Sequence, residues 1–165
     1  MKKIVPEKPG PGQESVWAYP RPPRVEPCNR HLQVVFNGVI VADTQRAYRV
    51  LETSHPPTYC FPPEDVLFDY LTLSKHSSFC EWKGQAQYYH VRVGDKQADQ
   101  AAWFYPEPTE PFTSLRNYLS FYPQPMDECR VDGEVVQPQP GGFYGGWITS
   151  DIVGPFKGGM GTLSW

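Results

Sequence analysis

Short runs of alternating apolar and polar residues, separated by turn residues, dominate the pattern of this chain. The clearest example covers residues 32–41, LQVVFNGVIV, where two β-rich runs flank Asn37-Gly38. An Asn-Gly dipeptide adopts two positive φ angles at low cost, so this stretch predicts a tight β-hairpin. Residues 129–136, CRVDGEVV, repeat the arrangement around an Asp-Gly dipeptide and predict a second hairpin.

Further strands are predicted at residues 86–93 (AQYYHVRV), 101–105 (AAWFY) and 115–122. Two proline pairs bracket residues 54–63 and exclude a helix there. Asp43 could cap a short helical turn at the start of residues 43–52, and the alternation that follows is ambiguous between helix and strand. Seven or eight short strands, with turn signals every ~8–12 residues, indicate a mainly β, sandwich-like or barrel-like fold.

The length of 165 residues suits one domain. Its 19 prolines, 14 glycines and 15% aromatic residues describe a chain with many turns and a core of flat rings. We expect a disordered tail over residues 1–13 and a single β-rich domain over residues 14–165. Within it we expect an extended proline-rich arm at 14–30, a core at about 31–131 and a glycine-rich tail at 137–165.

The formal net charge of −3 argues against nucleic-acid binding through a broad basic surface. No apolar run approaches the ~20 residues that cross a bilayer, and no apolar stretch follows the first lysines as in a secretory signal. These features predict a cytoplasmic protein that does not bind membranes. Its four cysteines are then expected as reduced thiols: Cys28, Cys60, Cys80 and Cys129.

Several motifs carry a resemblance to a known family. The segments LETSHPPTYCFPPEDV, CEWKGQAQYY and AAWFYPEP, followed by GGFYGGW and GPFKGG, resemble the domain of unknown function family 427, which is also found under a nucleotidyltransferase label. The resemblance implies a compact β-tent-like fold and no assigned activity. The family usually has tyrosine where this chain has Cys60, which makes Cys60 a poor candidate for chemistry.

The sequence contains few of the motifs that bind metal ions or phosphate groups. The cysteines form no CxxC pair, and the histidines are scattered, so we predict no metal site and no cofactor. No phosphate-binding loop is present, which disfavours the nucleotidyltransferase alternative. Lys157, in GPFKGGMG, is the best basic group among glycines for meeting a phosphate.

Cys80 is the sharper candidate for catalysis. In an extended segment Cys80 and Trp82 share one face and Lys83 the other, although a turn at Gly84 could change this. A nearby cation favours the thiolate, and His55 could serve as a base from elsewhere in the chain. The competing interpretation is a small buried thiol.

Aromatic residues gather in the same motifs and carry the preferred hypothesis. Strand alternation places Trp103 and Tyr105 on one face, with Phe104 on the other. We expect an aromatic-lined pocket for a flat or cationic ligand, because rings that face a cavity can stack on either. The full set of expected ring contacts is Tyr59, Trp82, Tyr88, Trp103 and Tyr105, and the expected polar groups are Glu52, His55 and Lys83. The alternative is a purely structural aromatic core.

Three functions therefore stay open. The first is a domain that binds a small molecule of unknown identity in this pocket. The second is an enzyme centred on Cys80 or His55, with either redox or transferase chemistry. The third is a protein-interaction module that uses the proline-rich arm. The sequence indicates neither the ligand nor the oligomeric state.

Overall fold

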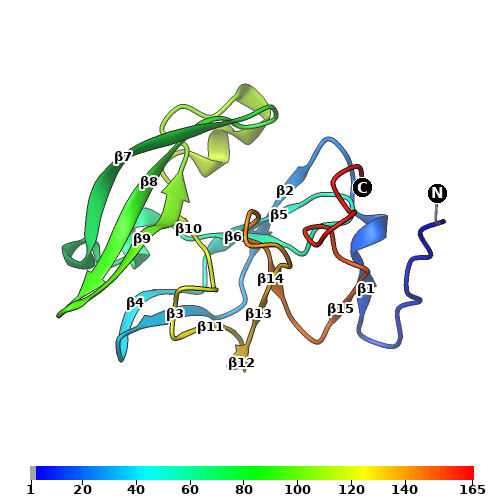
Figure 1. The fold of residues 1–165 in the computed structure, drawn as a ribbon, viewed down its shortest axis with the longest axis horizontal. Helices are drawn as coiled ribbons and strands as arrows, with labels where there is room; N and C mark the ends of the chain where they lie inside the picture. The colour runs from blue at the N-terminus through cyan, green and yellow to red at the C-terminus, as the bar shows by residue number, and fades with distance from the viewer. Residues whose placement is uncertain (1–2) are drawn as a thin grey trace.

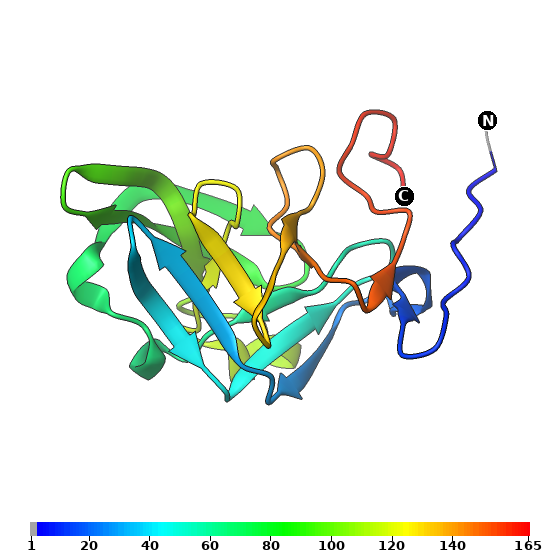
Figure 2. The ribbon, with the colours of Figure 1, turned by 90° about the horizontal axis from the view of Figure 1, so that it is seen from below.

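The computed structural model describes residues 3–165. The predicted mainly β fold is confirmed, and among these residues the sheets do not close into a barrel (Figures 1 and 2). One four-stranded sheet has the order β12-β11-β3-β4. Its strands are β3 (Leu32–Phe36), β4 (Val39–Thr44), β11 (Glu128–Val131) and β12 (Glu134–Val135).

Both predicted hairpins lie in this sheet. Asn37 and Gly38 have φ angles of 45° and 77°, and they connect β3 to β4. Asp132 and Gly133, with φ angles of 50° and 83°, connect β11 to β12. The turn chemistry of each dipeptide thus fixes the register of the two strands beside it.

A second four-stranded sheet, in the order β10-β9-β8-β7, rises beside the first and twists strongly (Figure 1). All its pairs are antiparallel. Its strands are β7 (Leu71–Cys80), β8 (Gly84–Val93), β9 (Lys96–Phe104) and β10 (Ser120–Phe121). The predicted strand over 115–122 is therefore wrong except near its end, at Ser120 and Phe121. Residues 110–115 form a 3-10 segment instead, and Asn117 turns the chain with φ +63°.

A three-stranded sheet, β2-β5-β6, joins the amino-terminal arm to the domain. Its strands are β2 (Arg24–Cys28), β5 (Ala47–Leu51) and β6 (Thr58–Cys60). The helical turn predicted at the start of residues 43–52 is wrong, because Asp43 continues β4 and its carboxylate meets the His31 ring at 2.7 Å across the hairpin. Pairing of β4 with β3 therefore determines the conformation of Asp43, although an aspartate is also a common helix cap. The ambiguous part that follows is a strand, β5.

The remaining elements are short. A parallel pair, β1 (Glu14–Ser15) with β15 (Ile152–Val153), brings the amino-terminal arm beside the carboxy-terminal segment. The other pair is β13 (Gln137–Pro138) with β14 (Trp147–Ile148). Single 3-10 turns cover η1 (Val16–Ala18), η2 (Pro63–Asp65), η3 (Phe68–Tyr70) and η4 (Glu110–Leu115). Both ends of the described chain lie at the same end of the molecule, where the Trp17 and Trp165 ring centroids are 5.6 Å apart (Figures 1 and 2).

The arm and the tail pack onto the domain. Val16 and Tyr19 are buried against Leu51 and Ile152. The predicted disordered tail, residues 1–13, falls partly on Met1 and Lys2, which lie outside the described residues. Further along this stretch, the Glu7 N–H donates to the Gly154 carbonyl at 2.8 Å. The division of residues 14–165 into arm, core and tail stays a proposal.

The main core lies between the two four-stranded sheets. Phe36 of β3 and Phe104 of β9 belong to one buried cluster, together with Phe61, Phe121 and Trp147. The Trp147 indole N–H donates to the Phe121 carbonyl at 3.0 Å, which satisfies its polar atom inside the core. Phe104 thus occupies one face of β9, and its neighbours Trp103 and Tyr105 are left for the other.

Candidate functional site

The far face of β9 borders an open cleft of about 740 Å³. Its walls come from the end of β5 and the segment after it, the β7-β8 hairpin, β9, the segment after β10 and the glycine-rich tail. Most small-molecule pockets have volumes of roughly 300–1,000 Å³, so the cleft has a size suited to such a ligand.

Aromatic side chains form its floor. Trp103 and Tyr105 share one face of β9, as strand alternation predicts, and both contribute to a cluster with Tyr88. Tyr88 of β8 lies directly opposite Trp103 in the antiparallel ladder. The Tyr122 ring completes the floor, with its centroid 4.6 Å from that of Trp103.

The glycine-rich tail covers one side of this floor. A Cβ atom added at Gly145 would lie 2.2 Å from Cη2 of Trp103, so only a glycine allows the backbone to lie against the indole. Trp103 is consequently only 8% exposed. It therefore offers only a small part of its surface to a ligand.

The β7-β8 hairpin supplies the rim. Residues 81–83 form a turn, and Gly84 has φ +101°. Because of this turn, Cys80, Trp82 and Lys83 all line the cleft, and the opposite orientation that an extended strand would give Lys83 is not adopted. Main-chain contacts with Thr109 hold the turn, since the Thr109 N–H donates to the Lys83 carbonyl at 3.1 Å.

His55 and Glu52 stand on another wall. Ser54, with φ +70°, turns the chain between them. The His55 ring is buried, with Nδ1 lying 2.9 Å from the Thr53 carbonyl oxygen and 3.8 Å from the Glu52 carboxylate. Burial lowers the pKa of His55, although Glu52 opposes the effect. At neutral pH the imidazole is therefore uncharged, with Nδ1–H donating to Thr53 and Nε2 left as an acceptor.

The four cysteines differ in exposure. Cys80 is half-buried at the cleft, whereas Cys28, Cys60 and Cys129 are buried. Burial raises the pKa of the Cys60 thiol, and its sulfur accepts a hydrogen bond from Ser120 Oγ at 3.3 Å. Cys80 is thus the cysteine placed where a ligand would meet it.

Among the predicted site residues, Tyr59 is the one that does not line the cleft. It is 1% exposed and packs in the main core, with its ring centroid 5.3 Å from that of Trp147. The other predicted residues line the cleft together: Glu52, His55, Cys80, Trp82, Lys83, Tyr88, Trp103 and Tyr105.

Comparison with known proteins shows that the chain matches one protein family. The family model for a domain of unknown function, DUF427, matches residues 24–132. The chain belongs to this family. No curated protein matches the chain.

The cleft of this DUF427 domain extends past the matched region. Tyr122 lies inside residues 24–132, but Phe143, Tyr144 and Lys157 lie beyond them. The Tyr144 ring contacts His55 edge-on, with centroids 4.9 Å apart. The sequence analysis includes the glycine-rich motifs that carry these residues but not their place in the cleft, because all three lie at least 40 positions beyond Trp103 along the chain.

Within residues 3–165, no three histidine, cysteine or acidic side chains gather as metal ligands would. No helix in the described part of the chain is long and apolar enough to span a membrane.

Proposed function

We propose that this DUF427 domain binds a small, flat organic molecule in the aromatic cleft. The observation that carries the proposal is the meeting of ring faces and a few polar groups around one hollow. Trp82, Tyr88 and Tyr122 are half-buried there, so parts of their surfaces are still accessible. Glu52, His55 and Lys83 surround the same space and would orient a ligand by hydrogen bonds and charge.

A thermal-shift screen tests this function. The panel contains nucleotides, nucleosides, cyclic imides, sulfoxides and quaternary amines, read alongside tryptophan fluorescence. A ligand at 100 times its dissociation constant should add ~2.7 kcal/mol to the free energy of unfolding. A binder in the cleft should also change the fluorescence of Trp82.

Two matched variants show whether the ligand binds beside Trp82. Trp82→Phe removes the fluorophore at the rim, and Trp17→Phe removes one that packs on Trp165 and does not line the cleft. The ligand-induced fluorescence change should shrink in W82F and persist in W17F. An equal change in both variants would show that the ligand does not contact Trp82 and would contradict the proposed position at the rim.

A second candidate function is thiol chemistry at the same cleft. It rests on the observation that Cys80 and His55, from separate segments, line one hollow. A nucleophilic Cys80 should react with iodoacetamide faster than a free model thiol at neutral pH. A ligand that the wild type alters chemically, and that Cys80→Ala binds but leaves unchanged, would establish an enzyme. A Cys80 no faster than the model thiol would count against one.

A further inference from the structure

Two lysines line the cleft from different segments, and neither forms an ion pair with an aspartate or glutamate among the described residues. Lys83 Nζ lies 5.4 Å from the Tyr105 ring centroid, and Lys157 Nζ lies 5.6 Å from that of Tyr144. Within residues 3–165, no aspartate or glutamate oxygen comes within 4.0 Å of either ammonium group. Lys157 also donates to an oxygen of Trp165, the last residue of the sequence, at 3.3 Å, and a carboxylate at this position would be an anionic partner. Lys83 is therefore the lysine of the cleft whose ammonium group rests on a ring face alone.

The carboxylates of the cleft do not neutralise these lysines. Glu52 already forms an ion pair with Arg21 at 3.3 Å. Asp99 accepts a hydrogen bond from Gln97 at 2.7 Å, and its side chain is 74% exposed to water. Glu81 is exposed in the turn of the β7-β8 hairpin. His55 adds no positive charge, since burial keeps it neutral at pH 7.

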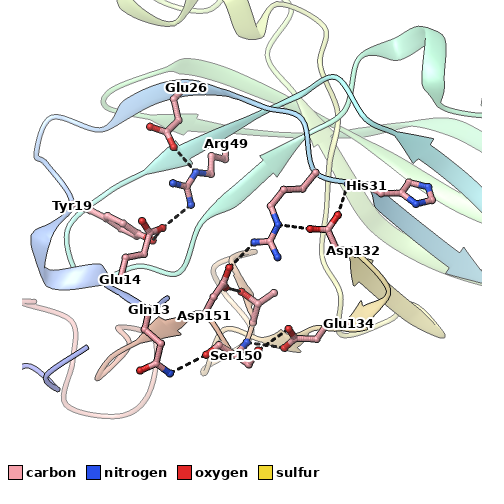
Figure 3. Close-up of polar contacts among 12 residues, drawn as sticks. Gln13, Glu14, Tyr19, Glu26, His31, Arg49, Asp132, Glu134, Ser150 and Asp151 are labelled. Atoms are coloured by element: carbon pink, nitrogen blue, oxygen red, sulfur yellow. Dashed lines mark hydrogen bonds and ion pairs between the residues drawn. The ribbon is translucent and has the colours of Figure 1, made fainter. Parts of the chain in front are cut away.

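Half-buried cations elsewhere in the molecule form ion pairs with acidic side chains. A second hollow, of about 340 Å³, lies beside β2 and β5 and contains Arg30 and Arg49. Arg49 binds Glu14 at 2.7 Å and Glu26 at 2.5 Å (Figure 3). Arg30 likewise binds Asp132 at 2.8 Å and Asp151 at 2.7 Å. Each arginine therefore has two acidic partners of its own, whereas the cleft lysines rest on ring faces.

We propose that the ligand of the cleft is a planar acid, that is, a flat aromatic molecule with a carboxylate or phosphate group. The ring would lie among Trp82, Tyr88 and Tyr122, and the anionic group would bind Lys83 or Lys157. A charge-assisted hydrogen bond to an anion is stronger than the contact of an ammonium group with a ring face. This inference rests on the proposed function, and it names the class of molecule that the same cleft takes.

The test compares three probes of one shape and different charge. They are naphthalene-2-carboxylate, naphthalene-2-carboxamide and naphthalen-2-ylmethylammonium, titrated into the full chain at low ionic strength. We expect the carboxylate to bind about tenfold more tightly than the amide, the size of one charge-assisted contact. The ammonium probe should bind more weakly than the amide.

Lysine variants show which contact is responsible. Lys83→Gln or Lys157→Gln should weaken binding of the carboxylate about tenfold and leave binding of the amide unchanged. Lys75→Gln is the matched control, because Lys75 is exposed on β7 and does not line the cleft. Unfolding midpoints of all three variants should match the wild type, which shows that the fold is retained.

The outcomes separate the two proposals. Equal affinity for carboxylate and amide, or tighter binding of the ammonium probe, would overturn the planar acid and leave a cleft that binds flat molecules. Tight binding of the carboxylate that neither K83Q nor K157Q weakens would also overturn it. If none of the three probes binds at millimolar concentration, the inference fails together with the proposed function.

Discussion

The two hollows of this domain have charged side chains in common and differ in how those charges are satisfied. In the hollow beside β2 and β5, Arg49 lies between Glu14 and Glu26 (Figure 3). Arg30 pairs with Asp132 and Asp151 in the same hollow. In the cleft, Lys83 contacts the ring of Tyr105 and finds no acidic partner among the described residues.

The difference shows that a charge in a hollow is weak evidence of a binding site. Ion pairs that are complete within the chain fix its own segments, here the arm against β5. A charge without an internal partner, placed among accessible rings, is available to a ligand. The predictions below test whether the first hollow is structural and the second is open to ligands.

The largest expected difference is in thiol reactivity, because each hollow contains one cysteine. Cys28 lines the charged hollow and is 7% exposed, and burial raises the pKa of its thiol. Cys80 lines the cleft and is half-buried. A buried thiol reacts only when the structure opens, so iodoacetamide should modify Cys80 more than about 100-fold faster than Cys28. Mass spectrometry of peptides from the native protein measures both rates.

A matched variant controls this experiment. Cys80→Ser should remove the fast phase and leave the slow modification of Cys28 unchanged. Similar rates at Cys28 and Cys80 in the native protein would show that the charged hollow opens as readily as the cleft, and the contrast between the two hollows would fail.

The next effect is on stability. Arg49 faces Glu26 directly in the β2-β5 ladder, and its side chain is 20% exposed. Arg49→Met would remove the half-buried partner of Glu14 and Glu26 and leave them only the Tyr19 hydroxyl and the exposed Arg24, so we expect a loss of about 2 kcal/mol in the free energy of unfolding. Arg24→Met is the control, because Arg24 is 56% exposed and forms a single pair at 3.3 Å, worth less than about 1 kcal/mol.

Urea unfolding of both variants measures the difference, and binding of naphthalene-2-carboxylate should be unchanged in each. If R49M lost no more stability than R24M, the ion pairs of the charged hollow would not hold the arm. If R49M instead weakened binding, the two hollows would not be independent.

The parts of the fold that local chemistry determines could be predicted from the sequence. Asn37-Gly38 and Asp132-Gly133 permit few backbone conformations other than tight turns, so both hairpins follow. Alternation along β9 likewise separates Trp103 and Tyr105 from Phe104. Each of these conclusions depends on residues within about ten positions of one another.

Other parts depend on contacts between distant segments. Tyr59 and Cys60 are neighbours in β6 and both are buried, in different clusters, so no pattern of polar residues indicates which side faces the main core. Tyr144 and Lys157 reach the cleft because Gly145 lies against Trp103 and because the Lys157 N–H donates to the Ser54 carbonyl at 2.8 Å. A local sequence pattern does not contain such pairings.

The smallest expected effect is the dependence of stability on pH, and the two hollows should differ in where it occurs. In the cleft, burial lowers the pKa of His55 from its ordinary value of 6.5. In the charged hollow, burial alone would raise the pKa of Glu14, but hydrogen bonds from Arg49 and Tyr19 outweigh it and lower the pKa below 4.5. A hydrogen bond from Arg30 lowers the pKa of Asp132 below 3.8.

In each case the folded protein holds its proton less tightly than the unfolded chain does. Stability is therefore complete above the unfolded pKa and is lost as the pH falls through the folded one. We expect a first decline below pH 6.5 from His55 and a second below pH 4.5 from the carboxylates, each of about 1 kcal/mol or less. Urea midpoints between pH 8 and pH 3 measure both.

Two variants assign the declines to their hollows. His55→Gln should flatten the upper decline and leave the lower one, because glutamine does not titrate. Glu14→Gln should reduce the lower decline only in part, since Arg46 holds down the pKa of Asp65 and the Gly38 N–H that of Asp127. An upper decline that survives H55Q would show that another group produces it, and it would contradict a pKa of His55 that burial lowers.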